Sequence, residues 1–347
     1  MNFSCTLRAI AAAALAACAA NSAIAQQAAA TLKPVEVQGH YENSVGSSDA
    51  ASQGSVNAAL IANRPIKRTG EILEFVPGLI VSQHSGDGKA NQYYLRGFNL
   101  DHGTDFATFV DGMPVNMRSH AHGQGYSDLN FLIPELVSRI DYKKGPYYAD
   151  EGDFASAGAA RLVLVDKLPA GIAAVTVGQN KYIRTLVANS MPMGNGQLLY
   201  ALDVAHNNGP WLNPENLRRF NGLLRYSQGS SDDGFNVTAM GYSARWNSTD
   251  QIPLRAVTAG TLDRFGAIDS SDGGQSSRYS LSAALRKRND WGPFEANAYA
   301  IRSSLDLFSN FTYFLDDPVN GDQFKQKERR TIYGANMSQS WSMKVAD

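Results

Sequence analysis

The sequence predicts an α+β domain followed by all-β strands that span a membrane. Between Ala58 and Leu168 short helix and strand signals are interleaved, whereas beyond Pro169 only strand signals remain. The chain of 347 residues contains 31 Gly, 15 Tyr and 15 Phe, and 18% of its residues are charged. Aromatic side chains favour pleated strands and glycine favours turns, so this composition disfavours an all-helical protein.

The charge balance argues against one class of partner. The chain has 31 Lys and Arg against 32 Asp and Glu, a formal net charge of −1. Proteins that hold nucleic acid need a basic face that neutralises phosphates. We therefore expect no nucleic-acid partner.

The first 25 residues have the features of a signal peptide. An apolar, alanine-rich run from Ala9 to Ala20 follows a short segment with one positive charge, and Ala23-Ile24-Ala25 has the small-x-small form of a cleavage site. Cleavage after Ala25 gives an exported protein without disulfides, because both cysteines lie in the removed segment. Two alternatives stay open: a membrane anchor, for which the run is short, and a lipobox at Leu15-Ala16-Ala17-Cys18, whose cysteine would be acylated.

A β-prone segment stands alone after the signal peptide, within residues 26–57. Pro34 biases its predecessor away from helix, and Val35 and Val37 fall on one face of an extended strand. The residues from Glu42 to Asn57 are rich in Ser, Ala, Gly and Asn, which predicts a flexible linker. An isolated strand can pair with the sheet edge of another protein, and a frayed terminus is the alternative. The candidate pairing residues are Leu32, Lys33, Pro34, Val35, Glu36 and Val37.

The α+β domain is predicted over residues 58–168. A threonine cap and apolar spacing predict a short helix over 69–76, ended by Pro77-Gly78. A helical turn is predicted at 134–137, because the N–H that proline lacks is unpaired anyway at the first helical position. The remaining apolar segments are flanked by turn residues and are predicted to be strands. The predicted strands are 79–82, 92–96, 107–111, 139–143 and 160–165.

Residues 169–347 alternate in polarity with the period of a strand. Leu202 and Val204 share one face while Asp203 lies on the other, and similar dyads recur over 219–227, 278–286 and 333–338. Segments of about ten such residues, with Tyr and Trp near their ends, are typical of transmembrane strands with an apolar outer and a polar inner face. A soluble β-sandwich is the alternative.

The connections between these strands alternate in length. Short connections are expected at 191–197, 228–234 and 288–293, and long ones at 207–218, 247–277 and 306–327. Short turns at one end and long loops at the other are typical of an outer-membrane barrel. About eight strands are predicted.

With these segments in order, the chain resembles a TonB-dependent outer-membrane receptor. Pro-Gly and Asp-Gly are common turn dipeptides, so no single motif is specific for the family. Five motifs in the family's order are specific. The matching segments are a TonB-box-like Leu32–Val37, then Val76–Val81, Tyr94–Phe98, Phe109–Pro114 and Arg139–Pro146.

The resemblance implies a fold and a set of partners. Residues 58–168 would be a plug folded inside a 22-stranded barrel, whose N-terminal part is 169–347. Leu32–Val37 would recruit TonB, which acts with the inner-membrane ExbB and ExbD proteins. The protein would lie in the outer-membrane lipid of a Gram-negative bacterium. The segment 247–277 would then be extracellular and 228–234 periplasmic.

Two departures from the family pattern are visible. The family's usual Leu-Tyr-Gly…Gly-Gly stretch is replaced by a divergent sequence over 147–158. Twenty-two strands of about ten residues need roughly 220 residues, and 179 follow Leu168. We therefore expect the sequence to be an N-terminal part of a longer protein, with an incomplete barrel.

Four of the six histidines fall between residues 84 and 122, and these form the candidate ligand site. His102, His120 and His122 are of the ligand type that zinc or copper prefers. The segment 118–124 has no strand or helix signal, so an apical plug loop facing substrate is expected. The alternative is that these are polar loop residues hydrogen-bonded inside the barrel. The candidate substrate-binding residues are His102, Asp105, Arg118, His120, His122 and Tyr126.

No enzyme signature accompanies this cluster. A metallohydrolase would need further ligands and a general base at motif spacing, and the sequence has no Gly-x-Ser-x-Gly elbow or phosphate loop. No cofactor is expected, and a metal enters only as transported ligand. The expected function is TonB-dependent uptake of a scarce, bulky nutrient, most simply a ferric siderophore or another metal complex. The alternative is an exported or lipid-anchored β-rich surface protein that binds a ligand without transport.

Overall fold

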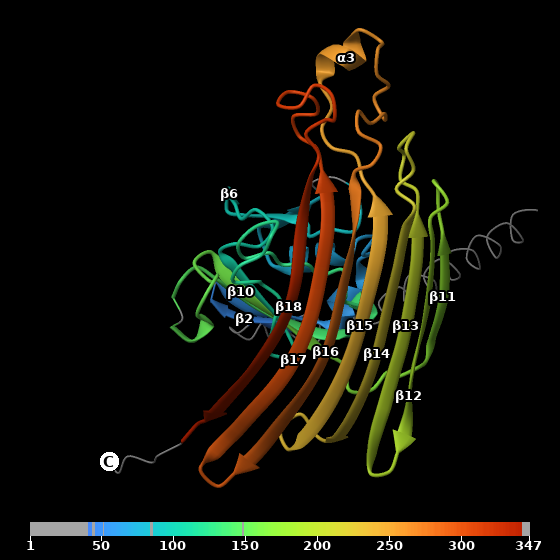
Figure 1. The fold of residues 1–347 in the computed structure, drawn as a ribbon. Coiled ribbons are helices and arrows are strands. Elements are labelled where there is room, and N and C mark those ends of the chain that lie inside the picture. Colours follow the sequence, from blue (N-terminus) through green and yellow to red (C-terminus); the bar gives the residue numbers. More distant parts are fainter. Residues whose placement is uncertain (1–40, 44–45, 51, 84–85, 148, 342–347) are drawn as a thin grey trace, which may run out of the picture. The chain divides into compact units, whose positions relative to one another are not determined.

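The computed structural model describes residues 41–43, 46–50, 52–83, 86–147 and 149–341, all within one compact unit (Figure 1). The segments predicted as signal peptide, lipobox and TonB box lie outside these residues. No described helix is long and apolar enough to cross a membrane. In the α+β domain, the strands are β1 Tyr41–Asn43, β2 Gly46–Ala50, β3 Gln53–Asn57, β4 Leu79–Ser82, β5 Gln92–Leu95, β6 Phe98–Asn99, β7 Phe106–Val110, β8 Met113–Pro114, β9 Val137–Lys144 and β10 Gly158–Leu164.

Two small sheets build this domain. The larger has the order β1-β2-β3-β9-β10-β7-β8, and β7 and β10 are parallel. The smaller has the order β4-β5-β6. Asp111 and Gly112 both have positive φ, +47° and +78°, so the Asp-Gly pair makes the tight turn between β7 and β8 that the sequence signals. The core is apolar and includes Ile72, Leu73, Val110, Leu132, Leu136, Ile140 and Leu162, each at most 2% exposed.

The helical segments are short. They are α2 Ala58–Asn63, η1 Thr69–Phe75, η2 Pro134–Leu136 and η3 Ala149–Glu151. The helix expected over 69–76 is a 3₁₀ helix, because a segment of two turns gains too few α-type hydrogen bonds to offset its nucleation cost. It ends where expected, before Pro77.

The predicted flexible linker from Glu42 to Asn57 is wrong. This stretch contains β1, β2 and β3, and β3 pairs antiparallel with β9, Val56 opposite Ile140. Val56 is 7% exposed, and the Asn57 side chain accepts the N–H groups of Ala59 and Leu60 as the cap of α2. The segment contributes one valine to the core, and the average composition of the segment does not reveal a single buried residue.

The second part of the chain is one eight-stranded antiparallel sheet in simple chain order. Its strands are β11 Ile172–Val177, β12 Ile183–Met193, β13 Gly196–Asn207, β14 Leu217–Gly229, β15 Gly234–Asn247, β16 Gly273–Asn289, β17 Gly292–Ser309 and β18 Phe324–Gln339. The turns 194–195, 230–233 and 290–291 lie at one end, and the loops 208–216, 248–272 and 310–323 at the other (Figure 1). The longest loop carries the helix α3 Leu254–Thr258. The predicted alternation of short and long connections is confirmed.

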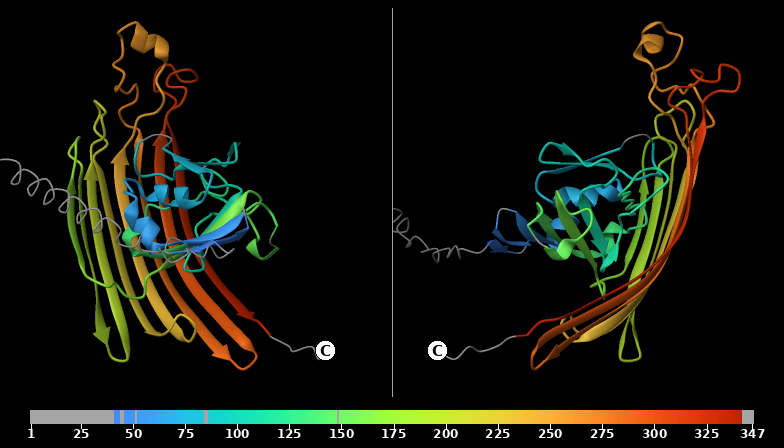
Figure 2. Two further views of the ribbon diagram at one scale, coloured as in Figure 1. Left: turned by 180° about the vertical axis from the view of Figure 1, so that it is seen from behind. Right: turned by 60° about the vertical axis from the view of Figure 1, so that its left-hand side comes forward.

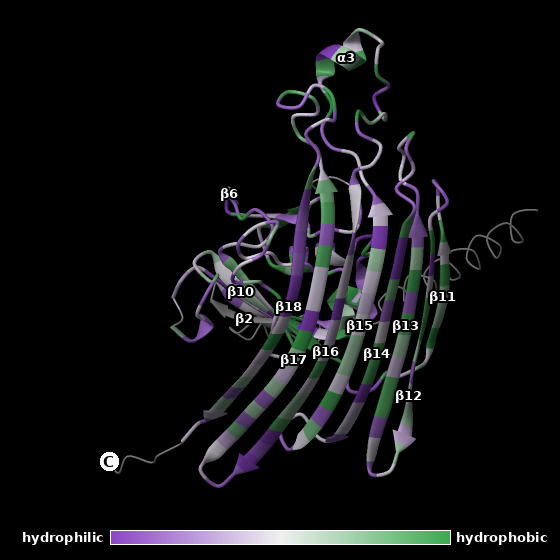
Figure 3. Ribbon diagram, in the orientation of Figure 1, coloured by the Kyte–Doolittle hydropathy of each residue, from purple (hydrophilic) through white to green (hydrophobic). Residues whose placement is uncertain are grey.

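The two faces of the sheet differ in polarity as the faces of membrane-spanning strands do, and not as those of a soluble β-sandwich. Apolar side chains point away from the α+β domain and are exposed, for example Leu224 at 56% and Leu281 at 55%. Polar side chains of the same strands are buried on the opposite face, Asp203 at 0% and Asn221 at 1% exposure. Figure 3 shows the resulting alternation of hydrophobic and hydrophilic residues along the strands. An apolar outer face and a polar inner face suit strands with lipid on one side.

The α+β domain packs on the polar face of this sheet (Figure 2). Arg184 of β12 donates to Glu135 at 2.6 Å, and Asn221 of β14 donates to the carbonyl of Asn130 at 3.0 Å. Arg225, 1% exposed, contacts Asp111 at 2.5 Å and Asp166 at 2.7 Å. These inner-face side chains thus find polar partners in the domain that packs on them.

The two ends of the sheet meet different parts of the domain. At the short-turn end, the Leu168 N–H donates to Ser190 Oγ at 3.0 Å. At the long-loop end, Asn207 donates to Asp87 at 2.8 Å, and His122 contacts Gln326 at 2.8 Å. The domain therefore leads into the sheet at the short-turn end and presents the loops around Asp87 and His122 at the long-loop end.

Candidate functional site

The candidate site is built on an irregular loop, as the sequence predicts. The segment 118–124 has no helix or strand, and two backbone hydrogen bonds between Met117 and the Gly125–Tyr126 pair close its base, at 2.8 and 3.0 Å. Asn116 ties this base to the rest of the domain, because its side chain accepts from the Thr108 N–H and donates to three carbonyls. The loop is thus a closed projection from a rigid base.

The fold brings together three of the predicted histidines and the predicted tyrosine. His102 Nε2 and His122 Nε2 are 3.0 Å apart. The ring of His120 stacks on that of Tyr126, with centroids 4.1 Å apart and planes 6° from parallel. Tyr126 is buried and its hydroxyl accepts the Ala90 N–H at 2.9 Å. His84 lies outside the described residues.

The hydrogen-bond partners of His102 indicate where its ring proton lies. His102 Nδ1 lies 3.1 Å from the Ala90 carbonyl and 3.2 Å from that of Asn91, and carbonyls only accept, so this nitrogen carries a proton. In a neutral His102, Nε2 must then accept a proton from His122 Nε2.

The second nitrogen of His122 also faces an acceptor. His122 Nδ1 is 2.8 Å from Gln326 Oε1, and the Gln326 amide is oriented by donating from Nε2 to the Ala121 carbonyl at 2.8 Å. A protonated His122 would donate from both nitrogens, to His102 Nε2 and to Gln326 Oε1.

Burial lowers the pKa of two rings in the cluster. His102 is 5% exposed, and burial, followed by the charge of His122, lowers its pKa to about 4. Burial likewise lowers the pKa of His120 to about 4, against the opposing effect of Glu328. At neutral pH both rings are uncharged.

Two predicted site residues do not join the cluster. Arg118 forms an exposed ion pair with Asp153, 3.0 Å between Nε and Oδ2. Asp105 accepts from Ser156 Oγ at 2.5 Å, on the part of the domain that leads to β10. The structure thus brings His102, His120, His122 and Tyr126 together, whereas Asp105 and Arg118 bind other residues outside the cluster.

The barrel strand β18 supplies residues that sequence reasoning missed. Gln326 binds the loop at His122 and Ala121, and Arg330 donates to Ser119 at 3.0 Å. Lys325, Lys327 and Arg329 alternate with Gln326, Glu328 and Arg330, so this end of β18 is polar on both faces. That loss of apolar alternation is the signal that could have identified a strand end in contact with the plug loop.

The metal role predicted for His102, His120 and His122 stays a prediction. The described residues contain no group of three His, Cys, Asp or Glu side chains placed to hold a metal ion. One histidine pair at 3.0 Å, next to a stacked tyrosine, presents ring nitrogens and ring edges. Such groups suit hydrogen bonds to an anionic ligand.

Residues 47–159 match the family model described as the TonB-dependent receptor plug domain. This segment is a TonB-dependent receptor plug domain. The plug lies on the polar face of eight antiparallel barrel strands, so the predicted fold, an α+β plug followed by all-β barrel strands, is confirmed. The family match begins at Ser47, before the predicted start of the plug at Ala58 and consistent with the pairing of β3.

Solved structures share the fold at low sequence identity. The copper transporter OprC has a TM-score of 0.63 and 16% identity, with 90% of this chain and 45% of that chain covered. The ferric citrate transporter FecA has a TM-score of 0.62, 14% identity and coverage of 76% and 41%. The siderophore receptor PirA from Acinetobacter baumannii has a TM-score of 0.55, 14% identity and coverage of 83% and 44%. This chain spans less than half the length of these proteins.

Proposed function

We propose that the protein is a TonB-dependent outer-membrane receptor that takes up an anionic metal complex, such as a ferric siderophore. The plug domain, packed on the polar face of strands whose other face is apolar, is the observation that carries this proposal. The names of the structural neighbours support the proposal, since they describe a copper transporter, a ferric citrate transporter and a siderophore receptor.

The ligand would meet the plug at the histidine cluster. A protonated His122 would place a positive charge on a loop at the long-loop end of the strands, and His120 and Tyr126 add ring faces beside it. Because both N–H groups of this imidazolium would bind His102 and Gln326, its charge would favour a carboxylate, catecholate or phosphate-like oxygen over a free metal cation. The metal would therefore arrive inside its chelator and not as a bare ion.

Energy would come from TonB and the associated ExbB and ExbD proteins in the inner membrane. The segment Leu32–Val37 is the proposed contact, by edge-on strand pairing. The protein would reach the outer membrane of a Gram-negative bacterium after cleavage behind Ala25, with the lipobox at Cys18 as the other processing route.

Replacing one box residue tests the proposal. Val35→Pro removes a backbone donor from the pairing strand, so uptake of a radiolabelled ferric chelate by whole cells should be abolished while surface binding is retained. Val35→Ala keeps the donor and serves as the matched control. Equal binding without uptake in both the wild type and the variant would instead indicate a surface protein that binds without transport.

A further inference from the structure

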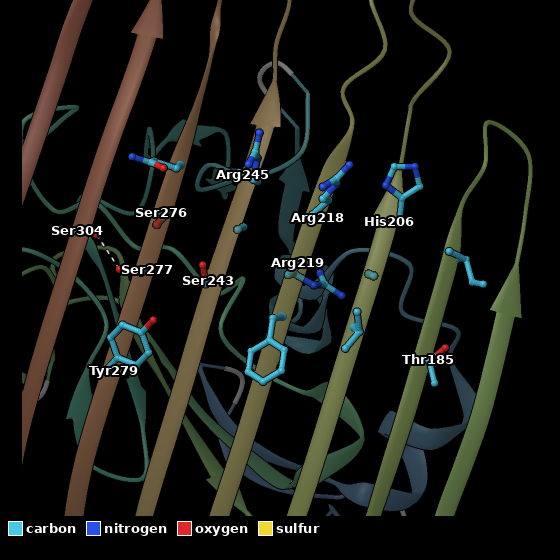
Figure 4. Close-up of a pocket in the computed structure, with 16 residues that line it drawn as sticks. Thr185, His206, Arg218, Arg219, Ser243, Arg245, Ser276, Ser277, Tyr279 and Ser304 are labelled. Carbon is cyan, nitrogen blue, oxygen red and sulfur yellow. Dashed lines mark hydrogen bonds between the residues drawn. The ribbon is translucent and has the colours of Figure 1, made fainter.

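The two ends of the loop 248–272 meet in a neck formed by Ser248–Asp250 and Asp272. Just below it, Asn247 of β15 is opposite Gly273 of β16, and the Ser248 N–H donates to the Asp272 carbonyl at 2.9 Å. Figure 4 shows the strands below the neck side by side, with Arg245 near the end of β15. The neck is therefore the point at which the hydrogen-bonded sheet ends and the loop begins.

Two aspartates of the neck form a carboxyl pair. The side chains of Asp250 and Asp272 are in hydrogen-bonding contact, and Asp272 is 2% exposed. Ionised carboxylates only accept hydrogen bonds, so a bond between two of them requires a proton. Asp272 Oδ2 is buried, and the described residues supply no donor to it. A proton held by the pair would provide the donor that the rest of this part of the chain does not.

A second long loop is held at the same pair. Asn310, the first residue after β17, donates its N–H to Asp250 Oδ2 at 3.1 Å. Gln323, the last residue before β18, donates from Nε2 to Asp272 Oδ1 at 3.0 Å. Both ends of the loop 310–323 are thus bound to the carboxyls that close the neck of the loop 248–272.

The plug also contributes a charge to this pair. Lys89 is 6% exposed; burial lowers its pKa, and the charges of Asp250 and Asp272 oppose this effect. The other titratable neighbours of Asp272 are Asp269 of its own loop and Tyr313 of the second loop. The carboxyl pair therefore meets one cation from the plug, a third carboxylate and a phenol.

We propose that Asp250 and Asp272 share one proton, and that this proton latches the two long loops to each other at the long-loop end of the plug. With the proton in place, each carboxyl keeps the hydrogen bond that it accepts from the second loop. Without it, two negative charges face each other in a buried site, where repulsion is stronger than in water. Lys89 offsets only one of these charges, so loss of the proton opens the neck.

The latch has a defined pH window. Burial, followed by the charges of Asp250 and Asp269, raises the pKa of Asp272 to about 7 in the closed neck, against the hydrogen bond from Gln323. An exposed aspartate in an open neck has a pKa of about 3.9. The closed neck is therefore favoured fully below about pH 3.9, and this advantage is lost as pH rises to about 7. The neck should be closed in mild acid and open more often at pH 8.

Hydrogen exchange of the full-length protein in detergent, at pH 5.5 and at pH 8, tests the latch. The readout is the protection factor, which compares each amide with an unstructured amide at the same pH, so the pH dependence of the exchange chemistry cancels. Protection of the Ser248 and Asn310 amides should fall roughly tenfold or more from pH 5.5 to pH 8. The Ser230 amide, which donates to the Asp233 carbonyl in a short turn, should be protected equally at both.

Three substitutions identify the group that titrates. Asp250→Asn and Asp272→Asn each replace one carboxyl by an amide that donates without titrating, so protection should be equal at the two pH values. Asp269→Asn is the matched control, because it removes a carboxyl from the same loop. Burial acts to raise the pKa of Asp269, but hydrogen bonds from Asn310 and Ser271 lower it overall. Asp269 is therefore ionised at both pH values, and its variant should keep the tenfold fall.

Two results would overturn the latch. One is equal protection of Ser248 and Asn310 at pH 5.5 and pH 8 in the wild type, which needs no variant to fold. The other is a fall that persists in both Asp250→Asn and Asp272→Asn. The experiment reads the order of the loops and not uptake, so its outcome is independent of the proposed function.

Discussion

His102 and His122 face each other through their Nε2 atoms, 3.0 Å apart, while His102 Nδ1 faces the Ala90 carbonyl and His122 Nδ1 faces Gln326 Oε1. One ring comes from the plug core and the other from the loop that β18 contacts. The pair therefore links the interior of the plug to the surface that faces the long loops.

The first prediction concerns the ligand. Replacing His120 and His122 together by Gln keeps polarity but removes the proposed charge of His122, so affinity for an anionic ferric chelate should fall about tenfold, near 1.4 kcal/mol. Fluorescence-quenching titration of the purified protein measures this. Arg118→Gln removes a charge from the same loop, but from a side chain paired with Asp153, and should leave affinity unchanged.

The same double variant separates chelate binding from metal coordination. Because the described residues contain no three-ligand metal group, free copper or zinc should bind weakly and equally to both proteins. Direct coordination predicts the opposite: the affinity for free metal should collapse in the variant, and it should also collapse in the wild type as pH falls below about 6. Either result would contradict binding of the metal as an intact chelate.

The second prediction concerns pH. The pKa of His102 is lowered to about 4 in the folded protein, so between its unfolded pKa near 6.5 and pH 4 the unfolded state binds the additional proton. The stability that His102 contributes is therefore fully present above about pH 6.5 and is lost as pH falls to 4, on the order of 3 kcal/mol.

A variant isolates this contribution from others of opposite sign. Burial raises the pKa of Asp128 to about 6, which changes plug stability with pH in the opposite direction. His102→Asn keeps a donor towards Ala90 but cannot titrate, so its unfolding free energy should depend less steeply on pH between 4 and 6.5 than that of the wild type. Hydrogen exchange of plug amides at several pH values measures both slopes, and identical slopes would refute the assignment.

The sequence predicts much of this architecture because the alternation of polarity along a strand and the residue preferences of a turn each depend on neighbouring residues. The dyads of β13 to β18, the Asp111-Gly112 turn and the irregular loop at 118–124 each depend on a few neighbouring residues. The contacts of His122 with Gln326 and of Ser119 with Arg330 join positions more than 200 residues apart. No local pattern contains that information, and for the same reason the different partners of Asp105 and Arg118 could not be predicted.

The third prediction concerns the attachment of the plug. Arg225 is 1% exposed and pairs with Asp111 at 2.5 Å, so Arg225→Met leaves a nearly buried carboxylate without its partner. Loss of one member of a buried pair typically costs about 3–5 kcal/mol. Hydrogen exchange around β7 and β8 should accelerate accordingly. Arg288→Met, which breaks an exposed pair with Asp232, should change exchange by less than about 1 kcal/mol.

A second substitution distinguishes a lost ion pair from a packing defect. Adding Asp111→Asn to Arg225→Met removes the unpaired charge, while Asn tolerates the positive φ of this turn and keeps the side-chain oxygen that accepts the Leu164 N–H. The double variant should therefore recover most of the protection lost in Arg225→Met. No recovery would mean that the arginine acts through packing against Thr238 and its neighbours.

The fourth prediction concerns the orientation of the strands in the membrane. The plug leads into β11 at the short-turn end, where Leu168 binds Ser190, and TonB acts from the periplasm, so the short turns should be periplasmic and the long loops extracellular. Ser271 lies in the 248–272 loop and Ser231 in the 230–233 turn, and both are exposed. Ser271→Cys should therefore react with an impermeant maleimide on whole cells, and Ser231→Cys should react only after the outer membrane is permeabilised. Because residues 26–347 contain no cysteine, each signal from this segment reports one position, and the reverse pattern would place the plug entry on the extracellular side.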